Sequence, residues 1–475
     1  MKRGIVAYGT YLPYWRLARP AIGAALGMPA GGGSRSVAGY DEDTTTMAVE
    51  AARVALASAP QPSRSCEVVF STTDPAYLDK ANAVAVHDAL GLPRSAPAFD
   101  MIGSVSSGSA ALRYAGRADG PVLVALSDMR NGMGGSSDER DGGDGAAAFL
   151  FDSTSQVVVE FLSFGSATSE FLDRWRLPGE ASSHLWEERF GEHEYIPLAE
   201  QAMADALKQA GVTSAEIDHF IVTGVHTRAV RALQHSSRFP AHALADDLTK
   251  AIGNTGTAHQ GLVLASVLDS AAPGALVLAV SLADGVEATV LRVSEQIDDY
   301  RNSRSARATV ASQLGSAKGD LSYMTFITWR ERFHREPPRR PEPTPPASPP
   351  SARHDPWKFA FTASRCTACG TRLIPPGRVC INCGAVDHMQ SERLADVPAT
   401  VATFTIDRLA FTPSPPMVVA VVDFDGGGRF RCELTDVDPD SLCIGDRVEM
   451  TFRKVSTSQA IHNYFWKAKP IRKEA

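Results

Sequence analysis

Residues 99–116 (FDMIGSVSSGSAALRYAG) join a short apolar run, a turn of small residues and a helical pattern. Gly103 and Gly108 let the backbone turn tightly, and the serines between them can cap the first turn of the helix that follows. The free N–H groups and the dipole of such a helix start favour negative charge. A strand, a tight turn and a helix in this order predict a layered α/β fold, although many folds use this junction without any chemistry.

A second stretch repeats this pattern. Residues 253–271 (GNTGTAHQGLVLASVLDSA) again join a Gly/Thr turn to an apolar helix, here from Leu262 to Leu268. Two similar halves of this kind indicate an internal duplication. A Gly/Ala-rich loop is expected before Gly39, and the other expected elements alternate along the chain. Strands are predicted at 4–12, 67–71, 122–126, 146–151, 157–161, 219–223, 276–281 and 288–293, and helices at 41–58 and 198–211.

Composition excludes several classes of function. The chain has 475 residues, of which 44% are hydrophobic and 21% are charged, as is usual for a globular protein. A net charge of −7 argues against binding nucleic acid or an anionic membrane. The start of the chain reads as a first strand and not as a signal peptide, and no apolar run is long enough to span a membrane. We therefore expect a cytoplasmic protein.

The C-terminal region contains a metal-binding pattern. Four of the seven cysteines, Cys366, Cys369, Cys380 and Cys383, form two C-x₂-C pairs separated by ten residues. This spacing can place four thiolates around Zn²⁺, and since every ligand is then a protein sulfur, the zinc is expected to be structural. Paired cysteines of this kind also favour a reducing compartment over a disulfide framework.

Five β-rich runs follow the cysteines, at 400–405, 417–422, 430–434, 447–452 and 464–466. Five short strands with Gly and Pro turns predict a small OB-type barrel. Between residues 353 and 475 there are 16 Lys/Arg and 14 Asp/Glu, a balance of +2 that is too even for a nucleic-acid binder. The basic pairs Arg429–Arg431 and Arg453–Lys454 are therefore interpreted as a solvated face, with contact to a CoA phosphate as the alternative.

A proline-rich stretch separates this module from the large domain. Residues 337–350 contain eight prolines. If they were extended at about 3.1 Å per residue, they would form a spacer of about 43 Å. We therefore predict a large domain at 1–335, a linker at 336–355, a zinc ribbon at 356–390 and an OB-fold domain at 391–475.

Residues 4–329 resemble the archaeal-type 3-hydroxy-3-methylglutaryl-CoA synthases of the thiolase superfamily. Asp100, Gly108 and the run Ser109–Leu112 match the turn that carries the nucleophile in that family. Further stretches match in order: GIVAYGTYLP, SVAGYDEDTTTMAVEAARVAL, GGDGAAAF, GNTGTAHQGLVLASVLD and PGALVLAVSLADG. The resemblance implies a duplicated thiolase-type α-β-α-β-α fold, a CoA thioester as substrate and a homodimer formed through this domain.

The chain departs from the family at the nucleophile. The position of the acyl-carrying cysteine is occupied by Val105, which cannot form a thioester. Cys66 is the only cysteine of the large domain, and we interpret it as a buried structural thiol. The resemblance therefore does not imply a cysteine-linked route.

Other family positions are partly kept. The glutamate position falls on Thr73, next to Asp74, while Tyr77 and Lys80 match. The family histidine falls near His226, where the alignment can shift by two or three residues, and Asn254 matches. The catalytic candidates are thus Asp74, Tyr77, Val105, Ser106, His226 and Asn254. The glycines assigned to cofactor binding are Gly108, Gly253 and Gly285.

A reaction that proceeds through an enolate needs no nucleophile and is therefore still possible for this chain. Asn254 and the backbone of residues 105–107 could hold a thioester enolate oxygen. Retro-aldol cleavage of a β-hydroxyacyl-CoA fits this set, with Asp74, Tyr77, His226 or His259 as base and His226 as the preferred one. Nucleophile-less thiolase relatives that act as aldolases with a ribbon–OB partner provide an analogue for this reaction.

Three alternatives remain. Ser104 or Ser106 could carry the acyl group with His226 as base. The domain could also be a non-catalytic acyl-CoA-binding partner of a thiolase or hydratase subunit, as the ribbon–OB accessory proteins suggest. It could also be a condensing synthase with an unusual nucleophile. His259 is interpreted as a core residue, and Asp284 and Glu287 as extra carboxylates near the pocket.

Overall fold

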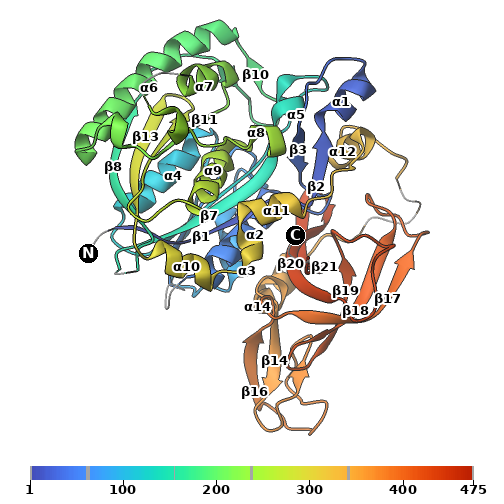
Figure 1. The fold of residues 1–475 in the computed structure, drawn as a ribbon. Helices are drawn as coiled ribbons and strands as arrows, with labels where there is room; N and C mark the ends of the chain where they lie inside the picture. The colour runs from blue at the N-terminus through green and yellow to red at the C-terminus, as the bar shows by residue number, and fades with distance from the viewer. Residues whose placement is uncertain are drawn as a thin grey trace.

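The computed structural model describes residues 3–472 except 60–64, 155, 236–238, 338 and 340–342. Its largest feature is a nine-stranded sheet (Figure 1). In spatial order the strands are β11 (His219–Gly224), β12 (Leu276–Leu282), β13 (Val286–Val293), β8 (Val159–Ala167), β1 (Gly4–Tyr11), β7 (Asp144–Asp152), β6 (Val122–Met129), β4 (Glu67–Thr72) and β5 (Ala98–Ile102).

The sheet consists of two halves that meet at one short pairing. Strand β1 pairs with β8 only through Gly4 and Ile5. Helices α4 (Ser106–Arg117) and α9 (His259–Leu268) contact strands of both halves, so they form the central helical layer. Helices α2 (Thr44–Ala57) and α3 (Ala83–Leu90) cover one half from outside, and α6 (Glu188–Ala210) and α7 (Thr227–Gln234) cover the other. This is the expected α-β-α-β-α arrangement.

The prediction of a loop before Gly39 is wrong for this segment of the chain. It contains a hairpin of β2 (Trp15–Ala18) and β3 (Ser34–Val37) around α1 (Arg19–Leu26), whose first turn holds Pro20, a favoured position for proline. The remaining elements of the large domain are small. They are α5 (Ser137–Asp141), β9 (Arg174–Trp175), β10 (His184–Leu185), α8 (Thr249–Ile252), α10 (Ile297–Ser303), α11 (Val310–Gly315), α12 (Tyr323–Trp329) and the 3₁₀ turns 214–216, 241–243, 256–258 and 306–308.

The C-terminal part consists of a small ribbon and a closed barrel. The ribbon pairs β15 (Arg372–Leu373), β14 (Thr362–Cys366) and β16 (Met389–Arg393). The barrel confirms the expected five strands, in the order β17 (Ala399–Asp407), β18 (Met417–Phe424), β19 (Arg429–Leu434), β21 (Ile461–Pro470) and β20 (Arg447–Ser458). Two short helices, α13 (Ser348–Arg353) and α14 (Asp355–Lys358), lie at the end of the predicted linker, whose residues 338 and 340–342 are outside the described residues.

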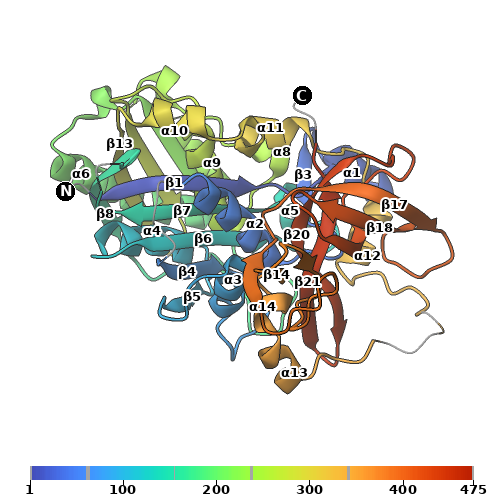
Figure 2. The same cartoon turned by 90° about the horizontal axis from the view of Figure 1, so that it is seen from below.

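The barrel lies directly against the large domain, with β20 next to α2 (Figure 2). Arg453 of β20 is fully buried and pairs with Glu42 at 2.9 Å and with Asp436 at 2.8 Å. Lys467 of β21 pairs with Asp41 at 2.9 Å. The prediction that Arg453 belongs to a solvated face is therefore wrong, whereas Arg429 is 66% exposed.

No helix in the described part of the chain is long and apolar enough to cross a membrane.

Candidate active site

Two backbone N–H groups of the turn between β5 and α4 form hydrogen bonds within the turn itself. Gly103 has a φ of +117°, which a residue with a side chain rarely adopts. The Ser106 N–H donates to Ser104 Oγ at 3.2 Å, and the Ser107 N–H donates to the Ser104 carbonyl at 3.1 Å. Of the expected oxyanion donors at 105–107, two are thus already used, and the Val105 N–H is the remaining candidate.

The two serines of this turn form hydrogen bonds away from histidine. Ser104 Oγ lies 2.9 Å from Ser106 Oγ and donates to the carboxylate of Asp284, in the turn between β12 and β13. This contact connects the α4 turn of the first half to the second half. Among the described residues, neither serine hydroxyl hydrogen-bonds to His226, the partner that an acyl-carrying serine would need.

His226 precedes α7 and acts as its N-cap. Its Nδ1 accepts the Ala229 N–H at 3.1 Å. Because Nδ1 is an acceptor there, a neutral ring carries its proton on Nε2, and this buried atom has no partner among the described residues. A Cβ on Gly191 would lie 2.5 Å from Nε2, so glycine is what leaves room for the ring. His226 is thus placed as a hydrogen-bond donor and not as a base.

Asn254 is held firmly by its neighbours. Its N–H donates to the Asp141 carbonyl at 2.7 Å, and its side-chain Oδ1 accepts the Gly256 N–H at 2.9 Å. Its Nδ2 donates to the Gly224 carbonyl at 2.7 Å. Since an amide carries two N–H bonds, one of them remains available for a ligand.

His226 and Asn254 line the same cavity, of about 430 Å³. The structure thus brings these two residues to one cavity, and their catalytic role stays a prediction. Asp74, Tyr77 and Val105 are not in the lining of this cavity. Five arginines line it together with one buried carboxylate that the sequence did not single out, Asp173. The arginines are Arg130, Arg140, Arg174, Arg228 and Arg231.

Asp173 lies in the segment between β8 and α6 and is buried. Burial and the nearby Asp284 raise the pKa of the Asp173 carboxyl, while His226 opposes this shift. Burial and the nearby Asp173 raise the pKa of the Tyr195 hydroxyl, and the ring of Tyr195 lies 5.7 Å from the ring of His226. No motif marks Asp173, because its partners come from other elements.

Asp74 and Tyr77 lie in the loop after β4. Burial and the nearby Asp128 raise the pKa of Asp74 to about 6. The hydroxyl of Tyr77 accepts the His462 N–H of the barrel at 2.8 Å, and the two rings are 5.1 Å apart. Tyr77 is therefore a contact to the OB barrel.

A second missed carboxylate, Asp128, organises the turns around the site. It is fully buried and accepts the hydroxyl of Thr73 at 2.7 Å and the N–H of Thr257 at 3.0 Å. The sequence resemblance aligns Thr73 with the family glutamate, and in the structure this hydroxyl anchors Asp128. The residue thus joins the loop after β4 to the turn before α9.

The three glycines expected to bind cofactor all lie against other backbone. A Cβ on Gly108 would lie 2.7 Å from the Thr257 carbonyl, and one on Gly253 would lie 2.2 Å from the Gly142 carbonyl. At Gly285 the distance to the Ala167 carbonyl would be 2.8 Å. Close packing explains each glycine, and their role in cofactor binding stays a prediction.

The remaining candidates are buried or paired. His259 Nδ1 faces the Thr255 hydroxyl at 3.2 Å, and burial lowers the pKa of the ring to about 4, so His259 is neutral. Glu287 pairs with Arg113 at 3.3 Å. Cys66 is buried, which raises the pKa of its thiol to about 11 and keeps it unreactive.

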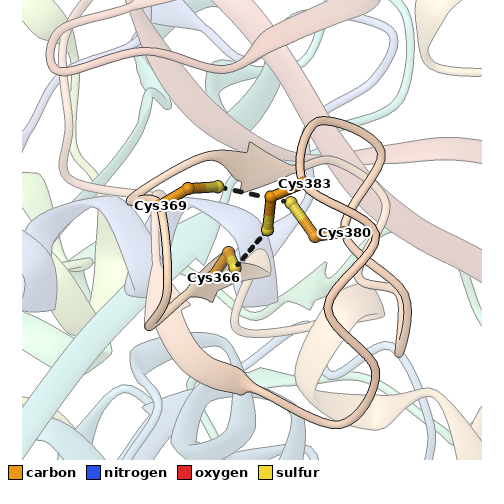
Figure 3. A group of neighbouring side chains, drawn as sticks. All are labelled: Cys366, Cys369, Cys380 and Cys383. Carbon is orange, nitrogen blue, oxygen red and sulfur yellow. Dashed lines mark hydrogen bonds between the residues drawn. The ribbon is translucent and has the colours of Figure 1, made fainter.

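The four paired cysteines converge at the tip of the ribbon (Figure 3). Their sulfur atoms lie within 4.8 Å of one another, with Cys366 and Cys383 at 3.7 Å and Cys369 and Cys380 at 3.5 Å. A tetrahedron with Zn–S bonds of about 2.3 Å has S–S edges of about 3.8 Å. The donor set therefore fits zinc.

Comparisons with known proteins find similar sequences for both the large domain and the barrel. Residues 207–293 match the model of the C-terminal domain of 3-oxoacyl-[acyl-carrier-protein] synthase III, and residues 392–453 match that of the C-terminal OB-fold domain of ChsH2. The hydroxymethylglutaryl-CoA synthase of Pyrococcus furiosus is 27% identical over 311 residues, which cover 63% of this chain and 89% of that protein.

Solved structures agree on the fold. A hydroxymethylglutaryl-CoA synthase complexed with CoA has a TM-score of 0.60 at 21% identity and covers 71% of this chain and 91% of its own. MvaS in complex with 3-hydroxy-3-methylglutaryl coenzyme A has a TM-score of 0.59 at 19% identity. The match covers 82% of this chain and 99% of the MvaS chain. The large domain is thus similar in sequence and in fold to these synthases, and residues 392–453 are similar to the OB-fold domain of ChsH2.

Proposed function

We propose that this chain, a hydroxymethylglutaryl-CoA-synthase-like domain joined to a ChsH2-like OB domain, binds an acyl-CoA thioester and cleaves one of its carbon–carbon bonds. The observation that carries this proposal is Val105 at the head of α4. His226 and Asn254 line one cavity, and none of the described cysteines is among its lining residues, which supports a reaction without an acyl-enzyme.

The names of the related proteins and the charge of the cavity support a CoA ligand. The relatives are synthases that use CoA thioesters, and the alignment covers 89% of the first of them. Arg228 and Arg231 lie one turn apart on α7 at the cavity. Guanidinium groups in this position suit the phosphates of CoA.

The proposed reaction is a retro-aldol cleavage of a β-hydroxyacyl-CoA. A base takes the proton of the β-hydroxyl, that oxygen becomes a carbonyl, and the electrons of the Cα–Cβ bond move toward the thioester carbonyl. The Nε2–H of His226 and the free N–H of Asn254 stabilise the negative charge on that oxygen. Protonation at Cα then releases an acyl-CoA and a ketone or aldehyde.

The test is turnover without a covalent intermediate. The purified protein is incubated with branched and aromatic 3-hydroxyacyl-CoA thioesters, and acyl-CoA and ketone are measured by mass spectrometry. We expect both products in equal amounts and an unchanged protein mass. An acyl adduct that Ser104→Ala or Ser106→Ala abolishes would establish the serine route instead, and condensation to a longer thioester would establish a synthase.

A non-catalytic partner role is the second candidate. It is favoured by the match of residues 392–453 to an OB-fold domain of ChsH2. In this case the chain would bind acyl-CoA and support a thiolase or hydratase subunit. Tight acyl-CoA binding with no turnover across the same panel would favour this function over the lyase.

We also propose a homodimer formed through the edge strand β5. In the described structure this strand pairs only with β4, and it leaves Ala98, Phe99 and Met101 half-buried. An unpaired edge of this kind can continue the sheet into a second copy. Light scattering is expected to give twice the mass of the chain, and Phe99→Lys is expected to give the monomer.

The third proposal is one structural Zn²⁺ per chain, which implies a reducing compartment such as the cytoplasm. Metal analysis is expected to find one zinc bound by Cys366, Cys369, Cys380 and Cys383. Because zinc binding is coupled to folding, a chelator should unfold residues 366–383 and leave the large domain folded. Loss of the large domain first would contradict a local role.

A further inference from the structure

We infer that Asp173, which lines the cavity together with His226 and Asn254, is the base that takes the β-hydroxyl proton and later delivers a proton to Cα. This inference rests on the proposed lyase function. It assigns the proton transfer to a carboxylate from the segment between β8 and α6, and not to His226 or to the loop of Asp74.

Asp173 differs from Asp138 and Asp141 of the same cavity because it forms no ion pair among the described residues. Asp138 holds Arg174 through two contacts of 2.7 and 3.0 Å, and Asp141 holds Arg140 at 2.6 Å. A carboxylate neutralised by arginine is a weak base. Asp173 is buried and forms no ion pair with any described residue.

The two imidazoles cannot replace it. The Nδ1 of His226 accepts the Ala229 N–H, so the neutral ring presents a proton to the cavity at Nε2. His259 is buried against Thr255 and is not among the lining residues. His226 is therefore suited to hydrogen-bond the thioester oxygen while Asp173 handles the proton.

The surroundings of Asp173 support this role. The Tyr195 hydroxyl lies near the carboxylate, which raises the pKa of Tyr195, and it accepts the Asp284 N–H at 3.3 Å. Burial raises its pKa, the negative charge of Asp284 adds to this, and His226 and Arg174 oppose it. A raised pKa makes the ionised carboxylate a stronger base, as general acid–base catalysis requires.

The position of Asp173 also compensates for the family glutamate that is absent from the loop after β4. The family glutamate corresponds to Thr73, whose hydroxyl is bound to Asp128 and offers no base. Asp173 returns a carboxylate to the site from a different element. In the resulting step the β-hydroxyl proton moves to Asp173, the Cα–Cβ bond breaks, and the same proton moves to Cα. No other reactant is needed.

The test separates this assignment from the lyase itself. The full-length protein is incubated with propionyl-CoA in D₂O, and deuterium at Cα is followed by mass spectrometry, because the last step in reverse removes that proton. We expect Asp173→Asn to slow exchange at least about 100-fold while propionyl-CoA binding, measured by calorimetry, stays within threefold. Asp173→Glu should restore part of the rate, and Asp138→Asn should slow exchange less than tenfold.

Each outcome decides one claim. Exchange that depends on Asp173 without cleavage of any β-hydroxyacyl-CoA supports the base and overturns the lyase. Cleavage and exchange at wild-type rates in Asp173→Asn overturn the base and leave the lyase. The pH profile is a second readout, since its acid limb should lie above the usual aspartate pKa of about 3.9 and vanish in Asp173→Asn. A wild-type protein that neither exchanges nor cleaves overturns both.

Discussion

The interface between α2 and the OB barrel and the cavity beside His226 both bury ionisable side chains, but they treat the charges differently. At the interface Arg453, Lys467 and Lys469 each lie within 3.2 Å of a carboxylate. In the cavity Asp173 forms no ion pair, and His226 Nε2 forms no hydrogen bond, with any described residue. Paired charges fix how two domains sit together, whereas unpaired ones remain free to act on a ligand.

The pKa shifts of the two regions show the same contrast. Burial alone would raise the pKa of Glu50, but Arg53 and Lys469 bring it down to about 2. Burial also raises the pKa of Asp173, and there no cation reverses the shift. Glu42 is an intermediate case, since burial raises its pKa to about 7 in spite of Arg453. The neighbouring cations therefore decide the direction of the pKa shift at Glu50, whereas burial prevails at Asp173 and Glu42.

Removing Arg453 should have the largest effect on stability. Arg453→Met keeps the volume of the side chain but leaves Glu42, Asp41 and Asp436 buried without their shared cation. Breaking a buried ion pair costs about 3–5 kcal/mol, which should appear as a lower midpoint of urea unfolding for the barrel. Arg429→Met is the matched control, since Arg429 is exposed on the same barrel, and its midpoint should not change.

An Arg453→Met protein with the midpoint of the wild type would contradict the comparison. It would mean that the carboxylates around Arg453 relax or protonate at no cost. The interface would then be held by its apolar and backbone contacts, such as the Phe452 N–H that donates to Glu50 at 3.1 Å.

Acid should weaken the interface by a slightly smaller amount. The pKa of Glu50 is 4.5 in the unfolded chain and about 2 in the folded one. A carboxylate with a lowered folded pKa contributes stability that is present above pH 4.5 and is lost as the pH falls toward 2. The shift corresponds to about 3 kcal/mol. Glu50→Gln should flatten this part of the stability-against-pH curve, and an unchanged slope would contradict the pairing.

How far the sequence could predict these regions depends on how local their signals are. The turns before α4 and α9, the five barrel strands and the cysteine spacing are local patterns, and each is found where it was expected. Arg453 was misread because its partners Glu42 and Asp41 lie about 400 residues earlier in the chain.

In the cavity, too, sequence patterns could not find a residue whose neighbours are distant in the chain. Asp173 was missed because the residues around it follow no helical or strand period, and its neighbour Tyr195 comes from α6. His226 and Asn254 were found through their motifs, but the use of Nδ1 by Ala229 appears only in the structure. Local motifs therefore identified His226 and Asn254, whereas Asp173 and the hydrogen bond of His226 Nδ1 required the coordinates.

The smallest stability effect is expected at His226, where the comparison is sharpest. His226→Asn keeps a side-chain oxygen that can cap α7 through the Ala229 N–H, so the free energy of unfolding should change by less than about 1 kcal/mol. The Nε2–H is lost, and loss of such a donor should slow turnover about 100- to 1,000-fold. His226→Ala removes the cap as well and should cost about 1 kcal/mol more. The opposite result would be a loss of several kcal/mol of unfolding free energy in His226→Asn with unchanged turnover. Such a variant would show that the ring stabilises the fold, as Arg453 does, and takes no part in the reaction.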